Sequence, residues 1–248
     1  VDPASDLPAL CAALLQQGDV ESAQPDVVVH TSYVPDDPYM SSSGTWGASY
    51  ADQWGPLAIN VTDALDFTSP YASNATIIGI MDTGLDYNHL DITDNVWVNP
   101  LESSGNATDE SYALSYEDDI RGYDFADGDN DPMDGVTVDA GHGTHVAGIA
   151  AARSNNSLGV AGVSPTSTVM VLKIFSDQGS GALGYATDAL DYAVAMGADV
   201  VNMSFGSDGT YDGFENAVAA GAASGLVMIA ALGNDSLNLD TSGVDFYP

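Results

Sequence analysis

Short apolar runs divide the chain, and most of them are bounded by glycine, proline or polar residues. Their length and their many β-branched side chains are typical of strands that are buried on both faces of a parallel sheet. A further short run lies inside a long acidic loop region. We therefore predict strands over residues 75–81, 122–125, 168–175, 199–204 and 226–231.

Between these runs, apolar residues recur every three or four positions, as they do along a helix with one buried face. Leu183, Ala186 and Leu190 show this spacing, and Gly197 follows as a stop signal. The pattern predicts helices over residues 6–17, from residue 142 onwards, from 183 to the stop, and over 213–223. Residues 27–29 are predicted to be extended, and the turn-rich residues 35–43 are predicted to be a linker.

The alternation of strands and helices predicts an α/β fold with three layers, in which a mostly parallel sheet is flanked by helices on both faces. In such sheets the reactive groups collect at the carboxyl ends of the strands. The residues that fall at those ends are Asp82, Ser204, Gly206, Gly233 and Asn234.

Charge narrows the choice of partner. The 248 residues include 36 acidic and only 3 basic side chains besides 4 histidines, for a net charge of −33. Such a chain repels the phosphates of nucleic acids and anionic membrane surfaces, so neither is expected as a partner. The acidity fits solvation in high salt, calcium binding, or both. Cys11 is the single cysteine, so no intrachain disulfide can form. No apolar run reaches the length of a membrane span.

One stretch, GHGTHVAGIAAA over residues 141–152, carries the strongest chemical signal. His142 lies between two glycines, which have no Cβ atoms and so let a reacting group approach the imidazole closely. A structural histidine or half of a zinc site would also place His142 there. The HExxH spacing of metalloproteases is absent, however, and a general base is favoured if a carboxylate and an oxyanion donor exist elsewhere.

Four segments supply those partners: IIGIMDTGLDYNH, GHGTHVAGIAAA, VVNMSFGS and IAALGND, in this order. Together they resemble the subtilisin-like serine proteases, or subtilases, and most closely their thermitase-like members. The resemblance covers most of residues 35–248. It implies that Asp82 is the triad aspartate, that His142 is the general base, and that Asn234 donates its side-chain amide to the oxyanion.

The family's nucleophilic serine lies in a GTSMA-type segment, which this chain does not contain. We therefore expect a fragment that lacks the serine segment and the C-terminal part of the fold, and that does not hydrolyse peptides alone. By resemblance, substrate would lie between two backbone segments as an added strand. Leu232 departs from the small residue usual before the Gly-Asn pair, and its extra volume is expected to change the shape of the pocket. The implied substrate-binding residues are Gly181, Ala182, Leu183, Ser204, Phe205, Gly206, Ala231, Leu232 and Gly233.

The resemblance also implies Ca²⁺, which prefers several hard oxygen ligands. A plain surface turn or a solvated acidic loop are the alternative interpretations of the two candidate sites. The first would use the side chains of Asp37, Asp91 and Asn156 and the carbonyls of Arg153, Leu158 and Val160. The second would use Asp124, Asp127 and Asp129, whose spacing resembles the second calcium site of the thermitase-like members.

Two domains are expected: residues 1–33 as the C-terminal tail of an inhibitory propeptide, and residues 34–248 as the N-terminal portion of the peptidase domain. The sequence thus predicts a secreted, monomeric serine endopeptidase precursor that acts on proteins or peptides and is inhibited by its own propeptide. Two alternatives are a pseudoprotease that kept the peptide-binding groove and an acidic calcium-binding structural domain. The joint presence of Asp82, His142 and Asn234 argues against the former, and HGTHVAG against the latter.

Overall fold

The computed structural model divides the chain into two compact units, residues 1–33 and 34–248. It describes residues 6–24, 34–68, 76–103, 116–135, 140–207 and 209–234. In the first unit, helix α1 (Leu7–Leu14) begins at Asp6, whose carboxylate accepts a hydrogen bond from the Ala9 backbone N–H (3.1 Å). The helix predicted over residues 6–17 is thus confirmed with narrower bounds. Residues 27–29 lie outside the described residues.

The second unit is built on a parallel sheet with strand order β2-β3-β1-β4-β5. The central strand β1 pairs with β3 and β4, which are its neighbours in space and not in sequence. All five predicted strands are confirmed to within a few residues. They are β1 (Ile77–Asp82), β2 (Gly122–Asp124), β3 (Thr168–Lys173), β4 (Val200–Met203) and β5 (Val227–Ala230).

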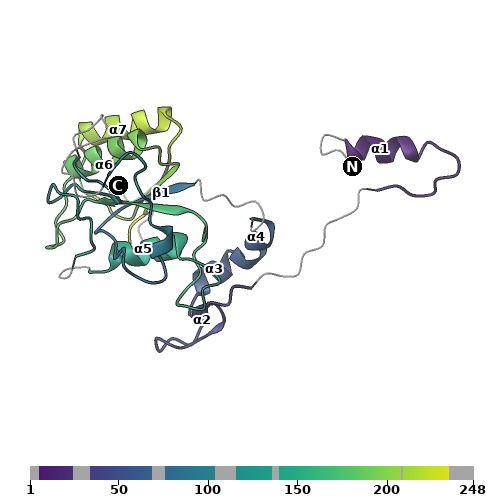
Figure 1. The fold of residues 1–248 in the computed structure, drawn as a ribbon, viewed down its shortest axis with the longest axis horizontal. Coiled ribbons are helices and arrows are strands. Elements are labelled where there is room, and N and C mark those ends of the chain that lie inside the picture. Colours follow the sequence, from purple (N-terminus) through teal and green to yellow (C-terminus); the bar gives the residue numbers. More distant parts are fainter. Residues whose placement is uncertain are drawn as a thin grey trace. The chain divides into compact units, whose positions relative to one another are not determined.

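Helices cover both faces of this sheet, which makes the three layers of the predicted α/β fold (Figure 1). Helix α5 (His142–Ala151) lies on one face, and α6 (Leu183–Ala195) and α7 (Asp212–Ala223) lie on the other. None of the helices in the described ranges combines the length and the apolar character needed to cross a membrane.

The core is split by the sheet because successive strand residues point to opposite faces. In β1, Ile80 packs in the cluster with α5, whereas Met81 packs in the cluster with α6 and α7. Small residues such as Ala147 and Ala151 let α5 lie close to the strands. This packing sets the height of α5 against β1, and therefore the height of the residues at its first turn.

The segment before β1 differs from the prediction. Residues 35–43 are not a linker: they form the short helix α2 (Pro38–Ser41), with Met40 buried, and the Asp37 carboxylate accepts a hydrogen bond from the Asn155 backbone N–H (2.9 Å). Contacts with a segment more than a hundred residues away order a stretch whose composition is typical of turns. Helices α3 (Trp54–Ala58) and α4 (Val61–Thr68) and the 3-10 turn η1 (Thr93–Asn95) were not predicted either.

Candidate active site

Asp82 is the last residue of β1 and lies at the carboxyl edge of the sheet, in the centre of the strand order. Its side chain is only 2% exposed. One carboxylate oxygen, Oδ1, accepts a hydrogen bond from the Thr83 backbone N–H (2.8 Å). The other oxygen, Oδ2, is buried and has no hydrogen-bond partner among the described residues. The strand therefore delivers a poorly solvated carboxylate to the edge where reactive groups are expected.

His142 is the first residue of α5, and the residue before it, Gly141, has φ 86°, a left-handed conformation that favours glycine. The imidazole Nδ1 lies 2.6 Å from Asp82 Oδ1. Its side chain is 47% exposed, so one edge of the ring is held by the carboxylate while the ring remains accessible to solvent. A carboxylate at Nδ1 favours the tautomer that carries its proton there, which leaves Nε2 as a base.

Burial raises the pKa of Asp82 above its ordinary value, and the hydrogen bond from His142 acts in the opposite direction. A carboxylate in this setting gains from a neighbouring positive charge, because water does not stabilise its ionised form. Formation of an imidazolium at His142 would supply that charge.

Close backbone approach makes this pairing possible. A Cβ atom at Gly143 would lie 2.2 Å from the carbonyl oxygen of Gly84 and 3.2 Å from Asp82 Cβ. The first turn of α5 therefore packs directly on the loop after β1, with no side chain between them. The two glycines flanking His142 thus have separate roles: Gly141 allows the turn, and Gly143 allows the contact.

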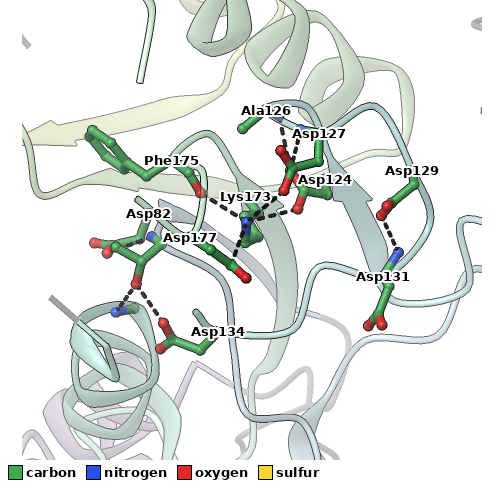
Figure 2. A network of polar contacts seen from close by, with 12 residues as sticks. Asp82, Asp124, Ala126, Asp127, Asp129, Asp131, Asp134, Lys173, Phe175 and Asp177 are labelled. Atoms are coloured by element: carbon green, nitrogen blue, oxygen red, sulfur yellow. Dashed lines mark hydrogen bonds and ion pairs between the residues drawn. The ribbon is translucent and has the colours of Figure 1, made fainter. Parts of the chain in front are cut away.

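A buried acidic side chain that the sequence analysis did not single out completes this contact. Asp134 accepts hydrogen bonds from the Thr83 hydroxyl (2.8 Å) and from the Thr144 hydroxyl (2.6 Å). In Figure 2, the bond from the Thr83 hydroxyl to Asp134 is the dashed line between the labels of Asp82 and Asp134. The position of Asp134 in an acidic loop hid it, since nothing in the local pattern separates it from its solvated neighbours.

Two segments proposed to bind substrate lie near each other at the same edge of the sheet. Phe175 follows β3 and forms an antiparallel bridge with Gly181, and its ring packs edge-to-face on that of Phe205, with centroids 6.0 Å apart. Ala182 and Leu183 begin α6, while Ser204 and Gly206 flank Phe205 after β4. The aromatic pair therefore connects residues 181–183 with residues 204–206. Phe175 was missed because an aromatic residue at a strand end is usually part of the core.

The third segment follows β5. Ala231, Leu232 and Gly233 are exposed, with Leu232 79% exposed, and Asn234 is the last described residue. Because β5 is parallel to β4, these residues leave the sheet at the edge that carries Asp82. Asn234 thus follows the carboxyl end of β5, and within the described residues it makes no hydrogen bond to Asp82 or His142; its role in the oxyanion hole stays a prediction.

The residues of the first predicted calcium site converge on the loop of residues 153–160. Asp91 accepts hydrogen bonds from the Asn156 side chain (2.9 Å) and the Val160 backbone N–H (2.8 Å), and the Arg153 backbone N–H donates to the Asp91 carbonyl. Asp37 contacts the same loop through Oδ2, and its Oδ1 is buried without a hydrogen-bond partner among the described residues. Burial raises the pKa of Asp37.

A buried carboxylate oxygen without a hydrogen-bond partner fits a cation ligand, so these residues fit Ca²⁺. The Leu158 backbone belongs to the same loop.

The second predicted calcium site has a different arrangement. Lys173 is buried, and its ammonium lies 2.8 Å from Asp124 and 3.9 Å from Asp127 (Figure 2). Asp129 instead accepts a hydrogen bond from the Asp131 backbone N–H. In the parts of the chain that the structure describes, no three acidic, histidine or cysteine side chains are grouped as metal ligands. Asp124, Asp127 and Asp129 therefore do not form a cluster of three metal-binding carboxylates in this structure. A second Ca²⁺ ion stays a prediction.

The chain is similar to proteins of a known family. The model of the subtilase family matches residues 73–246. A thermophilic serine proteinase of Bacillus sp. (strain AK1) is 35% identical over 92% of this chain and 47% of its own length. Thermitase of Thermoactinomyces vulgaris is 33% identical over 82% of this chain and 58% of its own length. A halolysin-like extracellular serine protease of Natrialba magadii is 32% identical over 90% of this chain and 35% of its own length.

Among solved structures, a cold adapted subtilisin-like serine proteinase aligns with a TM-score of 0.48 at 24% identity, covering 66% of this chain and 48% of that chain. An α/β fold with an aspartate–histidine pair at the carboxyl edge of its sheet is the class that the structure defines. Since the family model matches well over half of the residues, the chain belongs to the subtilase family. It spans about half the length of the curated relatives that it matches.

Proposed function

We propose that the protein containing this chain is a serine endopeptidase of the subtilase type, and that Asp82 and His142 are two members of its triad. The observation that carries the proposal is the 2.6 Å contact between His142 Nδ1 and Asp82 Oδ1 at the carboxyl edge of the sheet. Family membership supports it independently. The third member, a serine, would come from a segment outside this chain.

The mechanism follows from the orientation of the pair. His142 would take the proton of the serine hydroxyl as that oxygen attacks the substrate carbonyl, and would later give it to the leaving amine. Asp82 would hold the imidazole and stabilise the imidazolium. Asn234 would donate its amide to the developing oxyanion, and residues 181–183 and 204–206 would pair with the substrate backbone.

The edge of the sheet supports the view that this chain is one part of a larger fold. In β5, Val227 is 51% exposed and Ile229 is 54% exposed, and no strand pairs with the outer edge of β5 within the described residues. Exposed β-branched residues on an unpaired edge are normally covered. We therefore infer that further residues cover β5. That this chain alone does not cleave peptides is inferred separately, because it contains no GTSMA-type segment.

The test is made in the full-length protein. Asp82→Asn keeps the shape of the side chain but reverses the proton preference at Nδ1, so kcat on an unfolded protein substrate is expected to fall by about 10⁴-fold. Asp212→Asn, on the exposed first turn of α7, is the matched control and is expected to keep wild-type kcat. Equal activity of the two variants would refute the assignment. Peptide binding without cleavage by the wild-type protein would favour the pseudoprotease instead.

We further propose that residues 1–33 are the tail of an inhibitory propeptide, removed between His30 and Pro35, and that the enzyme is secreted and monomeric. The division of the chain between Tyr33 and Val34 supports the propeptide proposal, and the relative from Natrialba magadii, an extracellular serine protease, supports secretion. N-terminal sequencing of the mature protein tests it. A mature N-terminus upstream of Val20 would contradict it.

We also propose that Ca²⁺ binds between Asp37, Asp91 and the loop of residues 153–160. When bound, the ion would neutralise two carboxylates and tie the N-terminal segment to that loop. A chelator is then expected to lower the melting temperature by many degrees, because ligand binding to the native state stabilises it. In Asp37→Asn the chelator should have much less effect, whereas Asp63→Asn, which changes an exposed side chain on α4, should respond like wild type. Unchanged melting of the wild-type protein in chelator would exclude the ion.

A further inference from the structure

The proposed triad chemistry leaves one buried acidic residue beside it without a role. Asp134 is 8% exposed and belongs to no helix or strand. Its segment is pressed against the loop after β1: the Leu85 backbone N–H donates to the Pro132 carbonyl (3.1 Å), and a Cβ atom at Gly84 would lie 2.7 Å from the Met133 carbonyl oxygen. This backbone contact holds the Asp134 carboxylate close to both halves of the Asp82–His142 pair.

Each oxygen of the Asp134 carboxylate serves a different half. Oδ1 accepts from the Thr83 hydroxyl (2.8 Å), and the residue Thr83 also donates its backbone N–H to Asp82. Oδ2 accepts from both the backbone N–H (3.0 Å) and the hydroxyl (2.6 Å) of Thr144, in the first turn of α5. One side chain thus bridges the loop that carries the aspartate and the helix turn that carries the histidine.

Two further hydrogen bonds link the loop after β1 to the first turn of α5. The Thr83 hydroxyl, while donating to Asp134, accepts from the Gly143 backbone N–H (2.9 Å), and the Thr144 hydroxyl accepts from the Asp86 backbone N–H (2.8 Å). Two threonines that flank the pair therefore each donate to Asp134 and accept from the opposite segment. Both threonine hydroxyls donate their protons to Asp134, so their oxygens can only accept from the backbone N–H groups. The donor and the acceptor of each of these four hydrogen bonds are therefore fixed.

We propose that Asp134 is a positioning residue that fixes the distance and orientation of the His142 ring against Asp82. The inference rests on the proposed protease function for its effect on turnover, while its effect on the pair is independent of that function. An ionised carboxylate suits this position, because it accepts from three donors and lies at the positive amino end of a ten-residue helix. An apolar side chain there would leave the Thr144 N–H and two hydroxyls without an acceptor.

The experiment compares Asp134→Ala and Asp134→Asn with Asp119→Asn in the full-length protein. Asp119 is the buried control, because its carboxylate also accepts two hydrogen bonds, from Asn99 and Tyr192, but belongs to a separate cluster. A loose fit of catalytic groups can cost about 10²-fold in rate, so kcat of Asp134→Ala should fall by about that factor with KM within about twofold of wild type. Asp134→Asn keeps one acceptor for Thr144 but cannot accept from Thr83, and should lose about tenfold. Asp119→Asn should lower the melting temperature but leave kcat unchanged.

Proton NMR gives a readout that does not require turnover. The proton in the short bond between His142 Nδ1 and Asp82 Oδ1 should resonate far downfield of the backbone amides. We expect this resonance in the wild-type protein and in Asp119→Asn, a shifted signal in Asp134→Asn, and its loss in Asp134→Ala. If the wild-type protein shows the resonance but no protease activity, the proposed function fails while this test of Asp134 remains valid. An unchanged resonance and unchanged kcat in Asp134→Asn would overturn the inference, as would the absence of the resonance from wild type.

Discussion

At the scale of single residues, the contribution of a charged side chain to stability depends on its burial and on its partner. Lys173 is one of three lysine and arginine residues, and its side chain is 2% exposed. Its ammonium donates to the Phe175 carbonyl (2.9 Å) and pairs with Asp124, which is equally buried. Arg153, by contrast, pairs with Asp94 at the surface, where both side chains are at least half exposed.

The two pairs should therefore differ in their contribution to stability. Lys173→Met leaves the buried Asp124 carboxylate without a counter-ion and should lower the free energy of unfolding by about 3–5 kcal/mol. Arg153→Met breaks an exposed pair and should cost about 1 kcal/mol or less. Denaturant unfolding of each variant measures the difference. Similar losses in both variants would mean that Asp124 is neutralised by another group.

At the scale of elements, the site depends on how closely helix α5 approaches the loop after β1. Two glycines of α5 allow the effect of this close contact to be distinguished from the effect of helix propensity. Gly143 faces the Gly84 backbone, where an added Cβ would lie 2.2 Å from a carbonyl oxygen. Gly148, one and a half turns further along, has no atom within 4 Å of an added Cβ.

Replacing each of these two glycines by alanine should therefore change the free energy of unfolding in opposite directions. Gly148→Ala should raise the free energy of unfolding by up to about 1 kcal/mol, because alanine has the higher helix propensity. Gly143→Ala must displace α5 from the loop, and overpacking of this kind should cost about 1–3 kcal/mol. It should also weaken the downfield proton signal of His142. A stabilising effect of both alanines would show that α5 lies further from β1 than described.

At the scale of the whole molecule, net charge and burial act on stability in the same direction. Burial is the main cause of the raised pKa of Asp82 and Asp124. A raised folded-state pKa means that the native state binds protons more readily than the unfolded chain does. The associated stability is fully present below the ordinary value of 3.8 and is lost as the pH rises through each folded-state pKa. Self-repulsion at a net charge of −33 adds to this loss.

In chelator and at low ionic strength, the melting temperature should therefore decrease as the pH rises from about 4 to about 7. Added salt should reverse much of the decrease at the upper end, because it screens the repulsion between exposed carboxylates. Asp82→Asn should be more stable than wild type near neutral pH, and its advantage should shrink toward pH 4. Calorimetric melting over this range measures both effects. A melting temperature that rises with pH at low salt would contradict the conclusion that buried aspartates and net negative charge destabilise the fold near neutral pH.

Much of the fold could be anticipated because its determinants are local. Strand and helix periodicity repeats within ten or so residues, so β1, β3 and α6 were located to within a few positions. The segment around α2 could not be, since what orders it is the loop of residues 153–160. The same holds for Lys173: the sequence analysis assigned Asp124 and Asp127 to a metal, without the ammonium that the adjacent strand β3 brings to them.

The sequence by itself determined the order of strands and helices, the residue types available for catalysis, and the family resemblance carried by the segments around Asp82 and His142. The tertiary structure decided which of these residues meet: the 2.6 Å contact, the aromatic pair of Phe175 and Phe205, and the bridge made by Asp134. The reason is that β1 pairs with β3 and β4, so that residues far apart in the chain share one edge of the sheet. Local patterns do not specify distances between such residues, whereas strand order and close packing do.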